Sequence, residues 1–203
     1  GKSTQAKLLV ERLRAAGKRV EYLKYPIYDS ETGRELNNIL RNGGRIPSTK
    51  NFGEHFKDLK NDEKMEEFRH FSEEELQTLF MQNRLEFEPT LKRYLDEGAI
   101  VIAEDYTGTG IGWGMAKGLT REFLERLNKN LIHEDFAILL SGKRDDRARE
   151  AHHIHEQNIE LMNKVAGIFE ELGQLYGWER IKIQPKIEET AEMIYRAVLK
   201  KLA

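Results

Sequence analysis

Two short polar segments carry residue types that chemistry on a phosphate group would need. The first is Gly1-Lys2-Ser3-Thr4, which precedes apolar residues at helical spacing. Gly-Lys-Ser ends the pattern G-x-x-x-x-G-K-[ST], in which backbone N–H groups at a helix N-terminus bind phosphate oxygens. In that setting Lys2 would contact the β- and γ-phosphates of ATP, Ser3 would ligate Mg²⁺, and Thr4 could add a phosphate contact. A chance Gly-Lys-Ser in front of a helix is the alternative.

The second segment is Glu104-Asp105, directly after the apolar run 99–103 (AIVIA). Such a run predicts a strand buried on both faces of a parallel sheet, and ligands bind at the carboxyl ends of such strands. A carboxylate there can hold metal-bound water or accept a proton in phosphoryl transfer. An acidic turn that caps the next element is the alternative.

A glycine-rich run follows the acidic pair, with glycines at 108, 110, 112, 114 and 118. It predicts a flexible loop whose backbone can approach a ligand closely. Trp113 lies within this run, and its large apolar ring is either a lid that stacks on a base or a core anchor.

The charged stretch 143–149 (KRDDRAR) is a third candidate. An arginine here could stack on adenine or stabilise the transferring phosphoryl group, although a charge run is usually the solvated face of a helix. His152, His153, His155 and Glu156 follow and could bind a metal ion from one helix face. Mobile polar residues near a nucleotide are the favoured interpretation of these four side chains.

The elements that must position these residues alternate between helices and strands. We expect helices over 3–16, 31–40, 72–98, 120–130, 145–175 and 187–202, and strands over 19–25, 99–103, 136–140 and 178–183. Residues 72–75 have a capping-box pattern, and the charged segment 45–70 predicts a mobile insertion. The alternation predicts an α/β fold with a mostly parallel sheet, in a single domain over residues 1–203. We also expect an N-terminal strand and the start of the phosphate loop upstream of Gly1.

Composition narrows the classes of function. The 203 residues include 33 Lys and Arg and 35 Asp and Glu, a net charge of −2, which argues against a protein that coats nucleic acid. The absence of cysteine excludes disulfides, thiolate catalysis and Cys-ligated zinc, and a reducing cytoplasm is the expected compartment. No apolar run reaches the roughly 18 residues of a membrane span, so no membrane partner is expected.

Over nearly its whole length the chain resembles the thymidylate kinases, a family of P-loop nucleoside-monophosphate kinases. The matching segments are 1–5 (GKSTQ), 79–84 (LFMQNR), 99–114 (AIVIAEDYTGTGIGWG), 134–135 (ED) and 187–189 (IEE). The resemblance implies a P-loop NTPase-type three-layer α/β/α fold, with a helical lid over residues 142–158. It further implies ATP and Mg²⁺ as cofactors, nucleotides as partners, a homodimer, and phosphorylation of thymidine monophosphate (dTMP) to the diphosphate.

The resemblance also implies roles for individual residues. Phe80 would stack on thymine, although taken alone it is more often a core residue, and Arg84 would lie against the monophosphate and base. Glu104, Tyr106, Thr109 and Trp113 fall on the family's Asp, Tyr, Ser and aromatic positions. The expected site comprises catalytic residues (Lys2, Glu104, Arg147, Arg149), ATP-binding residues (Gly1, Lys2, Ser3, Thr4, Arg144), metal ligands (Ser3, Glu104) and acceptor-binding residues (Tyr28, Phe80, Arg84, Asp105, Tyr106, Thr109, Trp113).

Two positions depart from the family pattern. Asp105 stands where an arginine normally binds the acceptor phosphate, and Tyr28 stands where many members carry another arginine. A carboxylate repels a phosphate dianion unless a metal ion, lysine or arginine lies between them. Either Arg84 with a neighbour such as Arg34, Arg41 or Lys24 binds the phosphate, or the acceptor is not dTMP.

The departures leave two other functions open. A kinase of the same fold could act on another nucleotide or on a deoxynucleoside, where an acidic residue would bind or deprotonate a hydroxyl group. A non-catalytic nucleotide-binding protein would bind ATP without acceptor-dependent release of ADP, and Lys2 and Ser3 argue against it.

Overall fold

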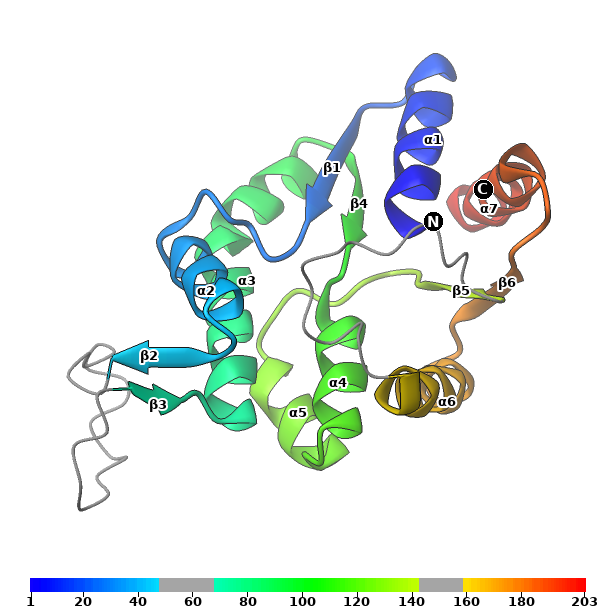
Figure 1. The fold of residues 1–203 in the computed structure, drawn as a ribbon. Coiled ribbons are helices and arrows are strands. Elements are labelled where there is room, and N and C mark those ends of the chain that lie inside the picture. The colour runs from blue at the N-terminus through cyan, green and yellow to red at the C-terminus, as the bar shows by residue number, and fades with distance from the viewer. Residues whose placement is uncertain (48–67, 143–158) are drawn as a thin grey trace.

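The computed structural model describes residues 1–47, 68–142 and 159–203 (Figure 1). The helices in these ranges are α1 (Lys2–Ala15), α2 (Glu31–Arg41), α3 (Glu73–Asp96), α4 (Thr107–Ala116), α5 (Arg121–Asn128), α6 (Ile159–Leu175) and α7 (Ile187–Leu202). The strands are β1 (Val20–Lys24), β2 (Arg45–Pro47), β3 (Phe68–His70), β4 (Ile100–Glu104), β5 (Ile138–Ser141) and β6 (Glu179–Lys182). This order confirms the expected α/β fold class.

The strands that position the candidate site run parallel. β1 pairs with β4, with Lys24 opposite Glu104, and β5 pairs with β6, with Ser141 opposite Lys182. β2 and β3 form a separate antiparallel pair. Within the described ranges the parallel strands therefore form two two-stranded sheets rather than one continuous sheet.

One hydrophobic cluster joins both parallel pairs. Leu13 of α1 is fully buried, and Val20 of β1, Ile181 of β6 and Ile194 of α7 complete the same cluster. Figure 1 shows α1 and α7 side by side next to the strands. The layer that covers the β1–β4 pair therefore also covers the β5–β6 pair.

Helix α3 begins with the capping box that its sequence predicts. The Ser72 hydroxyl accepts from the Glu75 N–H, and the Glu75 side chain accepts from the Ser72 N–H, which satisfies two backbone donors at the helix start. Pro89 lies inside the helix without dividing it. The helix packs its Leu76 and Leu79 against α2.

The prediction of a flexible loop over the glycine-rich run is wrong, because residues 107–116 form helix α4. Glycine disfavours a helix, but these glycines lie where neighbouring side chains press on the backbone. A β-carbon on Gly112 would lie 2.3 Å from the Phe169 ring, and one on Gly108 would lie 2.7 Å from the Trp178 ring. Tertiary packing therefore stabilises a helix that local propensity does not predict.

The prediction that the strand after Gly98 is buried on both faces is also wrong. Ala103 is exposed and residues 100–102 are only half-buried. In the described residues β4 pairs with β1 along one edge, and the elements above and below it cover its faces only in part.

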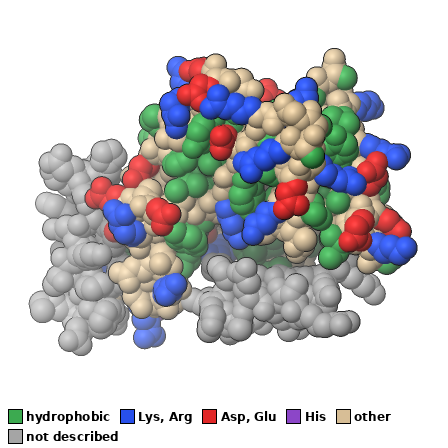
Figure 2. All heavy atoms as spheres, turned by 90° about the horizontal axis from the view of Figure 1, so that it is seen from above, with side chains coloured by type: hydrophobic (Ala, Val, Ile, Leu, Met, Phe, Trp, Pro, Cys, Tyr) green, Lys and Arg blue, Asp and Glu red, His purple; other side chains and the backbone are tan. Residues whose placement is uncertain are grey.

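The expected insertion and lid fall largely outside the description. Of the segment 45–70 the structure describes only 45–47 and 68–70, as β2 and β3, and of the lid only residue 142. Within 1–47, 68–142 and 159–203, no helix combines the length and apolarity that a membrane crossing requires. On the face shown in Figure 2, acidic and basic side chains are interspersed with apolar ones.

Candidate active site

The start of α1 meets the carboxyl end of β4. The Ser3 hydroxyl donates to Glu104 Oε1 over 2.6 Å, and the Lys2 ammonium forms an ion pair with Asp105. These contacts join residues about a hundred positions apart in sequence. The Gly-Lys-Ser segment and the acidic pair, two candidates identified separately in the sequence, thus lie in one place.

A left-handed residue gives the two carboxylates different neighbours. Asp105 has φ of +60°, a conformation that aspartate tolerates better than most residues. Glu104 is buried and faces Ser3, whereas Asp105 faces Lys2 and lies 3.4 Å from the Thr109 hydroxyl. The site therefore separates a buried carboxylate from a more accessible one.

The sequence analysis did not identify Tyr22 as part of this site. Its hydroxyl donates to Glu104, and burial together with this hydrogen bond raises the pKa of the Tyr22 phenol. Tyr22 and Lys24 are two residues apart on β1, so their side chains lie on the same face of the strand. Lys24 Nζ lies 3.4 Å from Ser3 Oγ and 3.9 Å from Glu104 Oε1. The two-residue spacing between Tyr22 and Lys24 could have identified Tyr22 from the sequence. Its contact with Glu104 could not be predicted in this way, because Glu104 lies on another strand.

The residues present fit a magnesium-bound nucleotide. Ser3 Oγ and Glu104 Oε1 are hard oxygen donors, which Mg²⁺ prefers. Among the described residues no side chain caps the N-terminus of α1, and the first N–H groups of a helix can bind an anion. The Lys2 side chain is 60% exposed and can turn toward a phosphate, and Thr4 is exposed beside it.

Arg84 is buried between α3, α4 and α5. Only 4% of the residue is exposed; Nη1 donates to Asn128 Oδ1 and Nη2 donates to the Tyr106 carbonyl, each over 3.2 Å. Burial lowers the pKa of Arg84 to about 10. A β-carbon on Gly110 would lie 2.8 Å from Arg84 Nη2. Arg84 therefore binds the start of α4 to the neighbouring helices.

The other expected acceptor residues are spread over two helices and two connecting segments. Phe80 packs against the cluster formed by α2 and α3, and Tyr106 donates its hydroxyl to the Ile132 carbonyl. Trp113 is half-buried on α4, and Tyr28 is 40% exposed in the segment before α2. Thr109 of the acceptor set contacts Asp105 beside Lys2, and Arg84 contacts the Tyr106 carbonyl.

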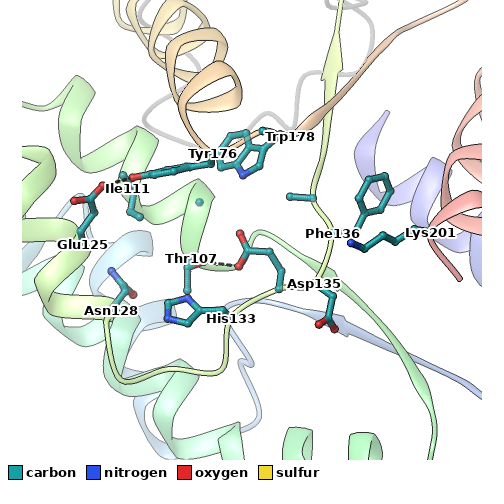
Figure 3. Close-up of a pocket in the computed structure, with 14 residues that line it drawn as sticks. Thr107, Ile111, Glu125, Asn128, His133, Asp135, Phe136, Tyr176, Trp178 and Lys201 are labelled. Carbon is teal, nitrogen blue, oxygen red and sulfur yellow. Dashed lines mark hydrogen bonds between the residues drawn. The ribbon is translucent and has the colours of Figure 1, made fainter.

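A cavity of about 600 Å³ lies beside α4, and its lining does not include the Lys2–Asp105 pair. Tyr176 and Trp178 lie along one side, and Thr107 and His133 lie opposite them (Figure 3). Thr107 donates to Glu134 over 3.2 Å, so the start of α4 is held to the segment before β5. The cavity adjoins the candidate site through α4 rather than containing it.

Several expected residues cannot be placed. Arg144, Arg147 and Arg149, and the possible metal ligands His152, His153, His155 and Glu156, lie outside the described residues. Within the described part of the chain, no group of three or more His, Asp or Glu side chains is arranged to bind a metal ion.

Comparison with known proteins identifies the family. The family model for thymidylate kinase matches residues 44–194, about three quarters of the chain. The chain belongs to the thymidylate kinase family. The expected family and the expected class of enzyme, a thymidylate kinase-like phosphotransferase, are both confirmed.

Individual thymidylate kinases resemble the chain over most of its length at low identity. The human enzyme is 25% identical over 199 residues, which cover 96% of this chain and 82% of the human protein. A protein of Invertebrate iridescent virus 6, named after the same kinase, is 27% identical over 89% of this chain and 74% of its own length. The thymidylate kinase structure from Candida albicans matches with a TM-score of 0.70 at 18% identity, over 98% of this chain and 86% of that one. The last match supports the P-loop NTPase fold of the family.

Proposed function

We propose that the protein transfers the γ-phosphoryl group of ATP to dTMP and releases ADP and thymidine diphosphate. The observation that carries the proposal is the convergence of Lys2 and Ser3 with Glu104 and Asp105 at the end of β4. Family membership supports the reaction class, and the acceptor is the part that is proposed.

The residues at the start of α1 would bind ATP. The N–H groups around Gly1, with Lys2 and Thr4, would bind phosphate oxygens, and Ser3 with Glu104 would hold Mg²⁺. Bound Mg²⁺ neutralises charge on the phosphates. Positioning and charge neutralisation account for most of the rate in this class of reaction. We include Arg144, Arg147 and Arg149 as candidates for the same task.

The reaction needs little acid–base chemistry when the acceptor is a monophosphate. An oxygen of the acceptor phosphate forms a new bond to the γ-phosphorus, and the bond from that phosphorus to the β,γ-bridging oxygen breaks. The attacking oxygen is already an anion, so no proton must be removed. Phe80, Arg84, Tyr106, Thr109, Trp113 and Tyr28 are the proposed acceptor residues.

A deoxynucleoside kinase is the second candidate, because Asp105 is negatively charged at a position where the family pattern has a positively charged arginine. A hydroxyl acceptor must lose a proton, and a carboxylate can accept it. The pairing of Asp105 with Lys2 favours the monophosphate, because the carboxylate is already engaged by a cation and is not free to contact the hydroxyl group of an acceptor.

The experiment is to incubate the purified full-length protein with ATP, Mg²⁺ and a panel of nucleosides and monophosphates, and to measure ADP release. A Lys2→Met variant serves as the control for contaminating activity. Release that depends on dTMP supports the proposal, and release with another acceptor alone replaces the substrate. Binding of ATP without release with any acceptor would favour a non-catalytic nucleotide-binding protein.

We further propose, from the resemblance, that residues 1–203 act as one domain and that two copies form a homodimer. Sedimentation velocity measures the assembly directly. A monomer at micromolar concentration would contradict it.

A further inference from the structure

The candidate site carries a charge problem that the family pattern does not solve. Glu104 and Asp105 place two carboxylates where two phosphate-bearing substrates must meet, and Lys2 is already paired with Asp105. Like charges a few ångströms apart repel strongly at a partly buried site. Mg²⁺ held by Ser3 and Glu104 would offset part of this negative charge, and a further protein cation near Ser3 would offset the charge that Asp105 adds.

Three of the four cations named as replacements are engaged elsewhere. Arg34 donates to the Asp29 carbonyl over 2.7 Å and Arg41 donates to Asn37 Oδ1 over 3.0 Å, both within or next to α2. Arg84 is buried, and its two terminal nitrogens donate to Tyr106, the N-cap residue of α4, and to Asn128 of α5.

The fourth cation, Lys24, is already at the site. It is the last residue of β1 and lies opposite Glu104 in the strand register. Its ammonium lies 3.4 Å from Ser3 Oγ and 3.9 Å from Glu104 Oε1, and its side chain is 48% exposed. The long distance to Glu104 and the exposure leave the ammonium able to turn toward a ligand, and a lysine stem is flexible enough to do so.

We propose that Lys24 binds phosphate oxygens at the point where the donor and acceptor phosphates meet. Its positive charge takes the place of the family arginines, at whose positions this chain has Asp105 and Tyr28. The inference rests on the proposed kinase function and names a specificity-determining residue for it. A cross-strand ion pair with the buried Glu104 that contacts no substrate is the competing role.

The test compares Lys24→Met and Lys24→Arg with Lys18→Met in the full-length protein. Lys18 is exposed near the opposite end of β1, so it controls for the loss of one positive charge. Calorimetry measures the Kd of dTMP, of thymidine and of ATP with Mg²⁺, and steady-state kinetics measure the KM of each substrate. The loss of one hydrogen bond between charged groups weakens binding by about 10- to 100-fold.

We expect Lys24→Met to raise the Kd of a phosphate-bearing ligand by that factor and to leave the Kd of thymidine unchanged. Lys24→Arg should largely restore binding of the phosphate-bearing ligand. A rise for dTMP assigns Lys24 to the acceptor phosphate, and a rise for ATP assigns it to the donor. Unchanged Kd values for both, in a folded variant, would overturn the proposal and leave Lys24 as a cross-strand ion pair. If the wild-type protein phosphorylates no acceptor, the kinase proposal fails, yet the ATP Kd still tests Lys24.

Discussion

At the scale of single residues, the adjacent carboxylates of Glu104 and Asp105 have different neighbours. The reason is the left-handed backbone conformation of Asp105, with φ of +60°. Glu104 is buried among Ser3 and Tyr22, while Asp105 reaches Lys2 and Thr109. The buried one is the better metal-binding candidate, because Ser3 shares it. The accessible one is the better candidate for contact with the acceptor.

Glu104→Gln should lower kcat by about 100-fold, because the proposed Mg²⁺ site loses a charged ligand and the transferring phosphoryl group loses part of its electrostatic stabilisation. The neutral amide is a weaker Mg²⁺ ligand, so half-maximal activity should also require more Mg²⁺. Activity measured across a Mg²⁺ titration checks both. Glu11→Gln, an exposed change on α1, should behave as wild type. An unchanged Mg²⁺ dependence in Glu104→Gln would remove Glu104 from the metal site.

At the scale of elements, α4 is the helix that brings the site into contact with the rest of the molecule. It begins two residues after Asp105 and packs against Arg84, Leu124 and Phe169. The glycines of α4 allow these side chains to pack closely against the helix backbone. The helix is therefore stabilised by its neighbours in the fold.

Gly112→Ala should destabilise the protein, although alanine is a better helix former than glycine. The added carbon would lie 2.3 Å from the Phe169 ring, and overpacking typically costs about 1–3 kcal/mol. Gly167→Ala on α6 is the matched control, because no atom of the described residues lies within 4 Å of its β-carbon position. That control should gain about 0.5–1 kcal/mol. Urea unfolding measures both, and equal signs would contradict the packing of α4.

The start of α3 should make stability depend on pH. Burial alone would raise the pKa of Glu75, but hydrogen bonds from Arg69 and from Ser72 outweigh it and hold that pKa below its ordinary value. A depressed carboxylate pKa stabilises the fold above the unfolded pKa of about 4.3, and this contribution is lost as pH falls through the folded pKa. Glu75→Gln should therefore be less stable than wild type at pH 7, with the difference shrinking in acid.

Unfolding curves at pH 7 and at about pH 3, below the ordinary glutamate pKa, provide the measurement. Glu74→Gln changes the neighbouring exposed carboxylate and should show little difference at either pH. A constant difference between Glu75→Gln and wild type at both values would contradict the assignment.

The sequence predicted elements best where the signal was local. The capping box at Ser72, the helix over 31–40 and the strand before Glu104 are set by neighbouring residues, and all three occur. Helix α4 was missed because what stabilises it comes from Phe169 and Trp178, more than fifty positions away. The Gly-Lys-Ser motif at the start of a helix and the acidic pair at a strand end each have a local pattern, so the sequence places both, whereas the Tyr22–Glu104 contact depends on strand pairing.

At the scale of the whole molecule, one cluster couples the two parallel pairs. Leu13 is fully buried where α1 meets β1, β6 and α7. Trp178 belongs to a different cluster, with Ile111, Leu124 and Leu172. The two clusters provide separate reporters of whether the protein unfolds as one unit.

Leu13→Ala should cost about 2–5 kcal/mol and lower the denaturation midpoint equally by far-UV circular dichroism and by tryptophan fluorescence. Coincident transitions indicate two-state unfolding. Leu85→Ala, at a position 48% exposed, should change stability by less than about 0.5 kcal/mol. A fluorescence transition that stays in place would show that the Trp178 cluster unfolds independently.

The charges around Ser3 also affect how a nucleotide arrives. Lys2 and Lys24 contribute two positive charges, and Glu104 and Asp105 contribute two negative ones, so the cluster sums to zero. Seen from beyond a Debye length of about 8–10 Å, such a cluster exerts almost no pull on an anion. Diffusional encounter with ATP would then gain little from electrostatic steering and depend only weakly on ionic strength. Attraction would begin only at short range, once the phosphates compete with Asp105 for Lys2.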